Sequence, residues 1–217
     1  MEWSWHPVQL SLYVAVIATL IAFVLAILAA YRIAGGKVKG KAIVETIFFM
    51  PLVLPPTVIG FVLIIIFGSN SPVGRALEWM LGKTLLFTVS AAIIAAVVVA
   101  FPLMYQSIKT GFLSVDPNII GAARVDGASN WKLLFLVIVP MSYRALLTAV
   151  ILGITRSFGE FGATLMFAGN IPGRTQTIPT VIYLAIESGR TDIAWYYVLI
   201  SISFSFILLL LINRTRQ

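Results

Sequence analysis

The sequence predicts an all-α integral membrane protein with about five transmembrane helices, and three observations support this fold class. Hydrophobic residues make up 60% of the 217 residues and charged residues only 11%, whereas a soluble domain has about half and about a quarter. Five stretches are long enough to cross about 30 Å of hydrocarbon at about 1.5 Å per residue. Lys and Arg are concentrated in alternate connecting segments, which is typical of membrane proteins.

Four of the predicted spans carry no charged residue, and the fifth contains Arg156 and Glu160. The first span follows an N-terminal segment without Lys or Arg and is too long for the core of a signal peptide, so we expect it to be retained as a helix. The stretch 177–186 is apolar but only about ten residues long, which favours a re-entrant or interfacial helix. The spans cover residues 8–31, 46–67, 85–108, 142–167 and 194–212.

The positions of Lys and Arg predict how the spans are oriented. Counted over alternate connecting segments, ten of these residues lie on one side and four on the other. Because cytoplasmic loops carry the excess, we expect the N-terminus outside and the C-terminus in the cytoplasm. No tandem repeat or long linker divides the chain, so residues 1–217 are expected to form a single multi-pass domain in the lipid bilayer of the cell membrane. The basic segments are 32–45, 109–144 and 213–217.

The segment between the third and fourth spans has the residues of two short helices joined by a sharp turn. Asp116-Pro117 is a typical helix start, because the carboxylate can cap free N–H groups and proline suits the first helical position. A helix of about ten residues then ends at Gly127, which can adopt the left-handed conformation. Ser129 or Asn130 can cap a second helix, and Pro140 is expected to bend the chain into the next span. On these residues alone, an ordinary amphipathic loop between spans is an equal alternative.

From Gly121 to Pro140 this segment resembles the cytoplasmic coupling loop of ABC importer permeases. The family pattern is Glu-Ala-Ala, three residues, Gly, nine residues, Ile, one residue and Leu-Pro. Val137 and Val139 stand where the family has Ile and Leu, which keeps the chemistry, whereas Gly121 replaces the family's Glu and leaves no carboxylate for a salt bridge. The residues that match in register are Ala122, Ala123, Gly127 and Pro140.

The resemblance implies the type I fold of ABC importer permeases, with a coupling loop at about residues 114–140 that seats on a separate ATPase. The four matching residues are then the ATPase-coupling residues, which transmit movement and perform no catalysis. The resemblance also implies a transport subunit and not an enzyme. We expect the chain to bind no cofactor or metal, because ATP and Mg²⁺ would be used by the partner ATPase.

Two regions carry candidates for the transport pathway or its gate. A charge at the centre of a span costs about 2.5–3.5 kcal/mol on insertion scales, so Arg156 and Glu160 are functional candidates. They can pair on one helix or across a subunit interface, and a structural pair that fixes packing is an equal alternative. Prolines in the second span bend or break its helix, and broken helices at membrane depth usually face a cavity. The candidates are Pro55, Pro56, Arg156, Gly159, Glu160 and Gly162.

Three sequence blocks narrow the resemblance to the molybdate and sulfate branch of these permeases. Met50–Gly60 is similar to the Pro-Leu-Val-Leu-Pro-Pro stretch of molybdate permeases. Arg156–Thr164 looks like the Arg-Ser and Gly-Glu-Phe-Gly segment of the molybdate and sulfate branch, and Asn170–Pro179 also resembles this branch. The resemblance implies a molybdate importer that works as a homodimer with two cytoplasmic ATPase subunits and an extracytoplasmic oxyanion-binding protein. Sulfate, thiosulfate or tungstate is the alternative cargo.

Other function classes have weaker support. The chain has no cysteine, and its one histidine, His6, precedes the first span, so an intramembrane hydrolase lacks its usual nucleophile and base. The net charge of +7 is explained by orienting Lys and Arg, so nucleic acid is not expected as a partner. An ion-gradient-driven carrier could use Glu160 as a proton site, but no inverted repeat is visible and the coupling loop would have no role.

Overall fold

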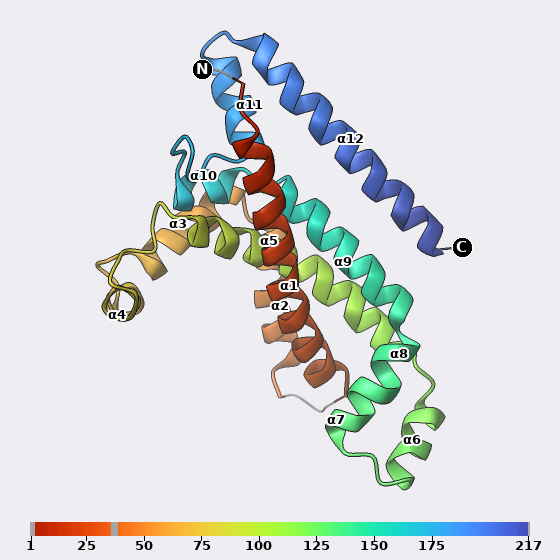
Figure 1. Cartoon of the computed structure of the whole chain (residues 1–217). Helices are drawn as coiled ribbons and strands as arrows, with labels where there is room; N and C mark the ends of the chain where they lie inside the picture. The colour runs from red at the N-terminus through yellow and green to blue at the C-terminus, as the bar shows by residue number, and fades with distance from the viewer. Residues whose placement is uncertain (1–2, 36–38, 217) are drawn as a thin grey trace.

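The computed structural model describes residues 3–35 and 39–216, and within these ranges the chain is helical and has no strand (Figure 1). The predicted all-α class is therefore confirmed. The helices in chain order are α1 (His6–Gly35), α2 (Lys41–Val53), α3 (Pro56–Phe67), α4 (Pro72–Leu81), α5 (Val89–Leu113), α6 (Pro117–Val125), α7 (Asn130–Lys132), the π-helix η1 (Leu133–Ile138), α8 (Val139–Met141), α9 (Tyr143–Phe158), α10 (Gly162–Ala168), α11 (Ile178–Glu187) and α12 (Thr191–Arg216).

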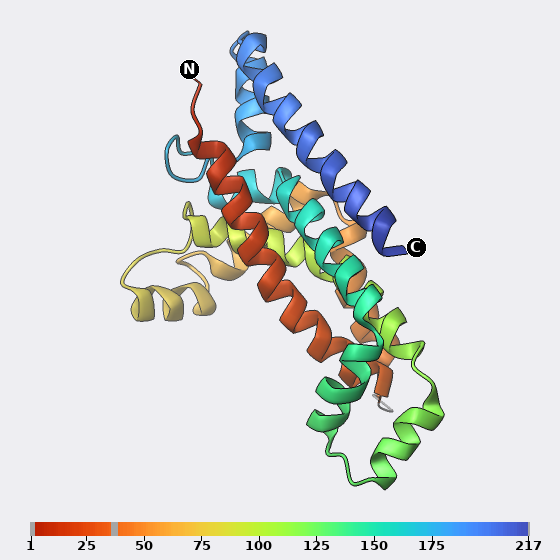
Figure 2. The same ribbon diagram turned by 45° about the vertical axis from the view of Figure 1, so that its right-hand side comes forward.

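The core is formed by α1, α5 and α9, which pack along one another (Figures 1 and 2). Small side chains allow this close approach, since every fourth residue along one face of α1 is a fully buried alanine. α9 joins them at Gly153, where a Cβ atom would lie 2.5 Å from Sδ of Met104 on α5. The alanines of this face are Ala18, Ala22, Ala26 and Ala30.

Three helices in the described part of the chain, α1, α5 and α12, are long and apolar enough to cross a membrane. Two bent pairs bring the number to five if each pair counts as one span, which agrees with the predicted number. α11 has ten residues and is too short to span, as its sequence predicts. α12 packs against α9 and α11 and otherwise exposes large apolar side chains, as a lipid-facing helix does.

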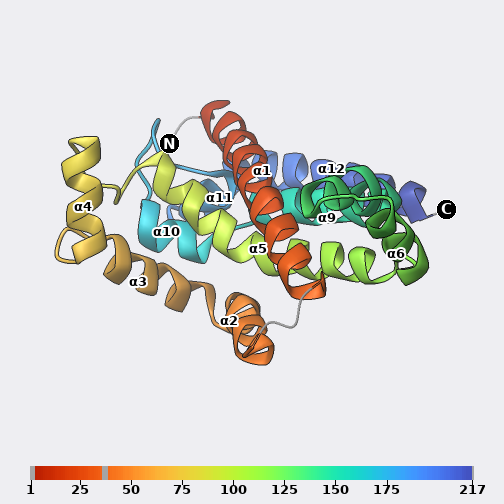
Figure 3. The ribbon, with the colours of Figure 1, turned by 90° about the horizontal axis from the view of Figure 1, so that it is seen from below.

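The predicted span 46–67 is a broken helix and not a straight one. α2 and α3 meet at an angle of 118°. Leu54 and Pro55 between them are extended, with ψ angles of 143° and 136°, because a residue followed by proline is disfavoured in the helical region. Figure 3 shows the result, in which α2, α3 and α4 follow one another along one edge of the molecule.

The predicted span 142–167 is also interrupted. α9 ends at Phe158, and α10 begins only at Gly162. At its other end, α9 is joined through a bend of 81° to the helical run Asn130–Met141, which contains the second short helix predicted after Ser129 or Asn130. The residues at the two breaks are Gly159, Glu160 and Phe161 after α9 and Ser142 before it, and no proline stands among them.

The two ends of the molecule carry segments that the sequence predicts to lie on opposite sides of the membrane. The N-terminus and the connection between α11 and α12 lie at one end, and α6 and α7 lie at the opposite end (Figures 1 and 2). These segments are separated along α1, whose 30 residues measure about 45 Å. α4, predicted outside, and the C-terminal end of α12, predicted cytoplasmic, both lie between the two ends, so the orientation in the membrane stays a prediction.

Candidate functional site

The coupling element, defined as α6, α7, η1 and α8, begins as the sequence predicts. A carboxylate oxygen of Asp116 accepts a hydrogen bond from the backbone N–H of Asn118 at 2.8 Å, and Pro117 lies in the first turn of α6. α6 ends at Val125, within one residue of the predicted end at Asp126.

The turn after α6 forms an exposed tip. Gly127 has a φ of +83°, the left-handed conformation predicted for it, and the N–H of Ala128 donates to the carbonyl of Ala123 at 3.0 Å. Ala122 and Gly127 are exposed, and Val125 is 89% exposed, whereas Ala123 is half-buried against the core. Two of the four predicted coupling residues, Ala122 and Gly127, therefore lie on this tip, where a partner protein could contact them, and Pro140 is exposed as well.

The second half of the coupling element is one continuous helical run. Oγ of Ser129, one of the two predicted caps, accepts a hydrogen bond from the N–H of Lys132 at 3.4 Å. The six residues of η1 form wide π turns, and such turns accommodate a helical proline such as Pro140, which has no N–H to donate. The bend into α9 therefore comes at Ser142, two residues after the predicted position.

Ser142 joins the coupling element to the transmembrane core. Its hydroxyl donates to the carbonyl of Gly111 on α5 at 3.0 Å. A Cβ atom at Gly111 would collide with Cβ of Ala145, so α5 and α9 approach closely there. The hydroxyl of Ser107 donates to the carbonyl of Ala145 at 2.9 Å and adds a second link. Movement of the coupling element would therefore be passed directly to α5 and α9.

The charged pair predicted inside the fourth span forms within this chain. Nη1 of Arg156 donates to Oε2 of Glu160 at 2.6 Å, and Oε1 of Glu160 accepts from the N–H of Ala163 at 2.9 Å. The side chain of Glu160 is 2% exposed and that of Arg156 is 27% exposed. Because α9 ends at Phe158, the pair does not lie on one continuous helix. Glu160 instead bridges the break and satisfies a free N–H at the start of α10.

The two broken helices pack directly against each other. A Cβ atom at Gly162 on α10 would lie 2.8 Å from Cβ of Pro56 on α3. One turn further along, a Cβ atom at Gly60 would lie 2.6 Å from Cβ of Met166. The structure thus brings together Pro56 and Gly162, two pathway candidates that lie far apart in the sequence.

Gly159 lies apart from this contact. It is exposed, and its Cβ position has only its own helix, the carbonyl of Thr155, within reach at 3.6 Å. It lines a separate cavity of about 390 Å³ bordered by α9, α11 and α12. The six pathway candidates are therefore not gathered around one cavity.

An ion pair that the sequence did not single out fixes α2 to α5. Glu45 on α2 pairs with Lys109 on α5, and the hydroxyl of Tyr105 donates to Oε1 of the same carboxylate at 2.8 Å. Tyr105 is fully buried and packs against the rings of Phe48 and Phe101. These contacts fix the position of α2, the helix that precedes the break at Pro55.

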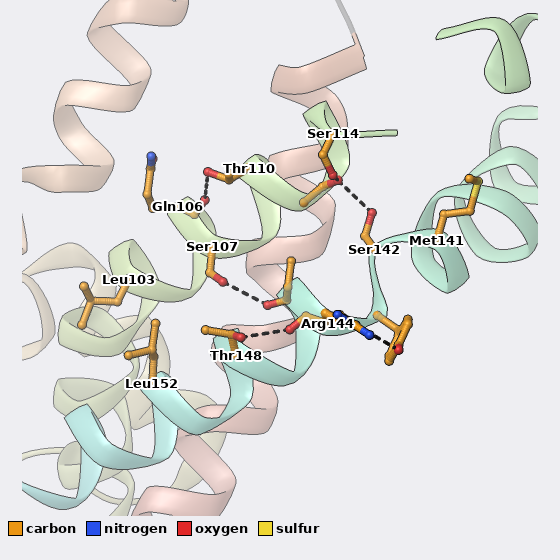
Figure 4. Close-up of a pocket in the computed structure, with 13 residues that line it drawn as sticks. Leu103, Gln106, Ser107, Thr110, Ser114, Met141, Ser142, Arg144, Thr148 and Leu152 are labelled. Carbon is orange, nitrogen blue, oxygen red and sulfur yellow. Dashed lines mark hydrogen bonds between the residues drawn. The ribbon is translucent and has the colours of Figure 1, made fainter. Parts of the chain in front are cut away.

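A cavity of about 730 Å³ between α5 and α9 was also missed by the sequence (Figure 4). Most of the hydroxyl groups on its wall donate to backbone carbonyls, as the dashed lines in Figure 4 show. The amide of Gln106, the hydroxyl of Tyr143 and the guanidinium of Arg144 are the remaining groups on this wall that can donate to an anion. The polar residues of the wall are Gln106, Ser107, Thr110, Ser114, Ser142, Tyr143, Arg144 and Thr148.

A signal for this cavity is present in the sequence. Gln106, Thr110 and Ser114 follow one another at intervals of four residues, so they lie on one face of α5. All three are exposed in the single chain. Polar groups at membrane depth are costly against lipid, so this face is expected to adjoin water or another protein surface.

A metal centre finds no support in the described part of the chain. No group of three or more His, Asp or Glu side chains is close enough to hold an ion between residues 3 and 35 or between 39 and 216.

Sequence comparison places this chain among known membrane proteins. Residues 22–216 match the profile of a family described as the binding-protein-dependent transport system inner membrane component. Identity is 52% over 210 residues with YvgM of Bacillus subtilis, provisionally named a molybdenum transport system permease protein, and covers 97% of this chain and 92% of that protein. Identity is 36% over 209 residues with the molybdenum transport system permease protein ModB of Escherichia coli K12, covering 96% and 91%.

Solved structures share the fold. The TM-score is 0.76, at 18% identity, with a chain of a bacterial alginate ABC transporter in complex with an alginate pentasaccharide-bound periplasmic protein, covering 100% of this chain and 79% of that chain. It is 0.69, at 15% identity, with a chain of the MetNI methionine ABC transporter in an inward-facing conformation, covering 98% and 92%. At these identities the likeness concerns the fold alone, and it confirms the fold that the coupling-loop resemblance implies.

Proposed function

The chain belongs to the family of binding-protein-dependent transport system inner membrane components, and we propose that it carries molybdate in an ATP-driven importer. As a member of this family it is a transport subunit and not an enzyme. The observation that carries the proposed cargo is the identity of 52%, over nearly the whole chain, with a protein named for molybdenum transport. Permeases named for sulfate transport match at 29% and 27% identity.

The proposed importer contains two copies of this chain, two cytoplasmic ATPase subunits and an extracytoplasmic oxyanion-binding protein. It lies in the cytoplasmic membrane, where residues 1–217 act as one transmembrane domain. ATP and Mg²⁺ bind to the ATPase subunits, and this chain holds no cofactor. The exposed tip around Gly127 supports docking of the ATPase at that end, opposite the N-terminus.

The polar face of α5 and α9 supports the homodimer. A face that carries Gln106, Thr110 and Arg144 is exposed in the single chain, whereas the exposed residues of α1, α3 and α12 are mostly large and apolar. Pairing two copies about a two-fold axis would bring two such faces together and line a polar passage between them. The passage would have few free donors, which suits an anion that must leave as readily as it enters.

Coupling follows the contacts of Ser142. In the proposed cycle the ATPase moves the tip with Ala122, Ala123 and Gly127, and the helical run that includes Pro140 passes this movement to α5 and α9. The cavity between these helices then widens or narrows. No residue of this chain needs to change its covalent state.

The gate is proposed at the contact between the two broken helices. Its members are Pro55 and Pro56 at the first break, and Arg156, Glu160 and Gly162 at the second. Gly159, the sixth candidate, lies apart from this contact and is not part of the proposed gate. If the pair contributes to the gate, Glu160→Gln and Arg156→Gln should each reduce transport or release ATP hydrolysis from substrate control. Normal molybdate uptake with normal coupling in both variants would remove this assignment.

The cargo is tested by uptake of radiolabelled molybdate in cells that lack this chain and in cells complemented with it. We expect uptake to be lost and rescued, and to be competed far better by tungstate than by sulfate. Unchanged molybdate uptake together with lost sulfate uptake would overturn the cargo and keep the permease. Collapse of uptake by an uncoupler while ATP is maintained would favour an ion-gradient-driven carrier instead.

A further inference from the structure

A second large cavity lies between the end of α1 and the coupling element. Its volume is about 650 Å³, within the range of small-molecule sites. α1, α6 and the run of α7 and η1 form its walls, and these elements meet at the end of the molecule opposite the N-terminus (Figures 1 and 2). The hydroxyl of Tyr31 donates to the carbonyl of Asn130 at 2.9 Å and ties α1 to α7 beside the cavity.

The cavity has two basic side chains with no acidic partner. Arg32 comes from α1 and Arg124 from α6, and both line the cavity and are exposed. Neither takes part in an ion pair within the described ranges, where the paired basic residues are Lys109, Arg156 and Arg190. Two guanidinium groups on separate elements can bind one phosphate group from two sides.

The membrane side of the cavity is apolar. Leu20, Val24 and Leu28 are exposed along α1 at intervals of four residues, so they form one row on the helix surface. Arg32 is the next residue of this row. On the other wall, the ring of Trp131 stacks on that of Phe135 with centroids 5.8 Å apart, and both rings are exposed.

We propose that this cavity binds the head group of an anionic phospholipid from the cytoplasmic leaflet. The phosphate lies between Arg32 and Arg124, and an acyl chain lies along the exposed row of α1. A free oxyanion has the same head-group chemistry, but it would leave the apolar row without a role. Basic pockets at the cytoplasmic ends of membrane helices suit such lipids. The bound lipid connects α1 to α6, so the membrane itself would help to hold the coupling element in place.

The test uses the complete importer, purified with its ATPase and placed in nanodiscs of phosphatidylcholine with a minor fraction of phosphatidylglycerol. Spin-labelled forms of both lipids report the fraction of lipid that the protein immobilises. We expect preferential immobilisation of phosphatidylglycerol, and Arg32→Gln and Arg124→Gln should each lower that preference about fivefold. Lys132→Gln is the matched control, because Lys132 is an exposed basic residue next to Trp131 that does not line the cavity.

Three results would overturn the proposal. An unchanged preference in Arg32→Gln and Arg124→Gln would mean that the cavity holds no anionic lipid. An equal loss in Lys132→Gln would mean that diffuse surface charge attracts the lipid. Displacement of phosphatidylglycerol by inorganic phosphate or molybdate at low millimolar concentration would make a free oxyanion the ligand. A single symmetric peak in gel filtration and unchanged binding of phosphatidylcholine establish that each variant is folded.

Discussion

At the scale of single residues, Gly127 is the position where a side chain should matter most. Its φ of +83° is strained for any residue with a Cβ atom, and a β-branched residue suffers most. Gly127→Val is expected to cost about 1–2 kcal/mol in the turn and to reduce molybdate uptake severalfold, with hydrolysis of ATP no longer coupled to transport. Because no atom lies within 4 Å of the Cβ position, the effect would come from the backbone alone. The control is Gly121→Ala, which should transport normally, because Gly121 lies within α6 and no atom lies within 4 Å of its Cβ position. Normal uptake in Gly127→Val would argue against the coupling assignment.

Gly121 itself offers a complementary prediction. The Cβ position of Gly121 also has no atom within 4 Å, so the glutamate of the family pattern fits there without a clash. Glycine inside a helix costs about 0.5–1 kcal/mol relative to a good helix former. Gly121→Glu should therefore raise the thermal unfolding temperature of the purified importer slightly and preserve uptake. A fall in unfolding temperature would show that the surroundings of α6 differ from those described.

The pair of Arg156 and Glu160 allows a separation of structural and transport roles. Removing either charge leaves its partner without a counter-ion, and Glu160→Gln also weakens the hydrogen bond to the N–H of Ala163. We expect each single variant to be less stable, and the double variant Arg156→Gln with Glu160→Gln to be less affected than the sum, with a coupling energy of about 0.5–3 kcal/mol. Thermal unfolding of the four proteins measures this cycle. Additive losses would mean that the two side chains do not act as a pair.

At the scale of elements, the contact between α3 and α10 should be sensitive to a single methyl group. Gly162→Ala places a Cβ atom 2.8 Å from that of Pro56, so one of the helices must move. Such overpacking costs about 1–3 kcal/mol, and we expect a lower unfolding temperature and slower uptake. Gly159→Ala is the matched control, because its nearest contact is the carbonyl of Thr155 at 3.6 Å. If both alanine variants behave alike, the close contact is not required for function.

The elements also show what sequence reasoning can and cannot predict. The cap of α6 at Asp116 and the left-handed Gly127 follow from local chemistry, and both were predicted. Ser129 caps the second helix and was one of two predicted caps. The bend at Ser142 depends on a hydrogen bond to Gly111, 31 residues away, so local signals placed it at Pro140 instead. The break after Phe158 was missed for a similar reason, because it is stabilised by the side chain of Glu160 and by packing on α3.

The cavity between α5 and α9 was missed for a different reason. Ser and Thr inside a helix commonly donate to a carbonyl one turn earlier, as Thr110 and Thr148 do. Their presence in a span therefore carries little functional information by itself. Only the alignment of Gln106, Thr110 and Ser114 on one face distinguishes a polar surface from scattered hydroxyls.

At the scale of the whole molecule, the sequence predicts an orientation in the membrane but does not predict the shape. Lys and Arg counts depend only on which segments connect the spans, and they predict that the N-terminus and the segment of α6 and α7 lie on opposite sides of the membrane. These two segments lie at opposite ends of the molecule. The angle of 118° between α2 and α3 depends on how these two helices pack against the rest of the molecule. The prolines indicate that the helix breaks, but they do not determine the angle of the break. The likeness to solved permeases shows the fold of one subunit. The pairing of two copies of this chain is left to experiment.

The proposed homodimer gives the last prediction. If the polar face of α5 lies at the two-fold axis, the same residue from two copies approaches itself there. The natural chain has no cysteine, so one introduced thiol reports a single position without background. Gln106→Cys is expected to form a disulfide-linked dimer in oxidised membranes, and the yield should change when ATP hydrolysis is blocked because the passage alternates between two widths. Leu199→Cys, on the exposed face of α12, is the control that should remain monomeric on a non-reducing gel. Efficient cross-linking at Leu199 with none at Gln106 would place the interface on α12 and turn the polar face of α5 away from the axis.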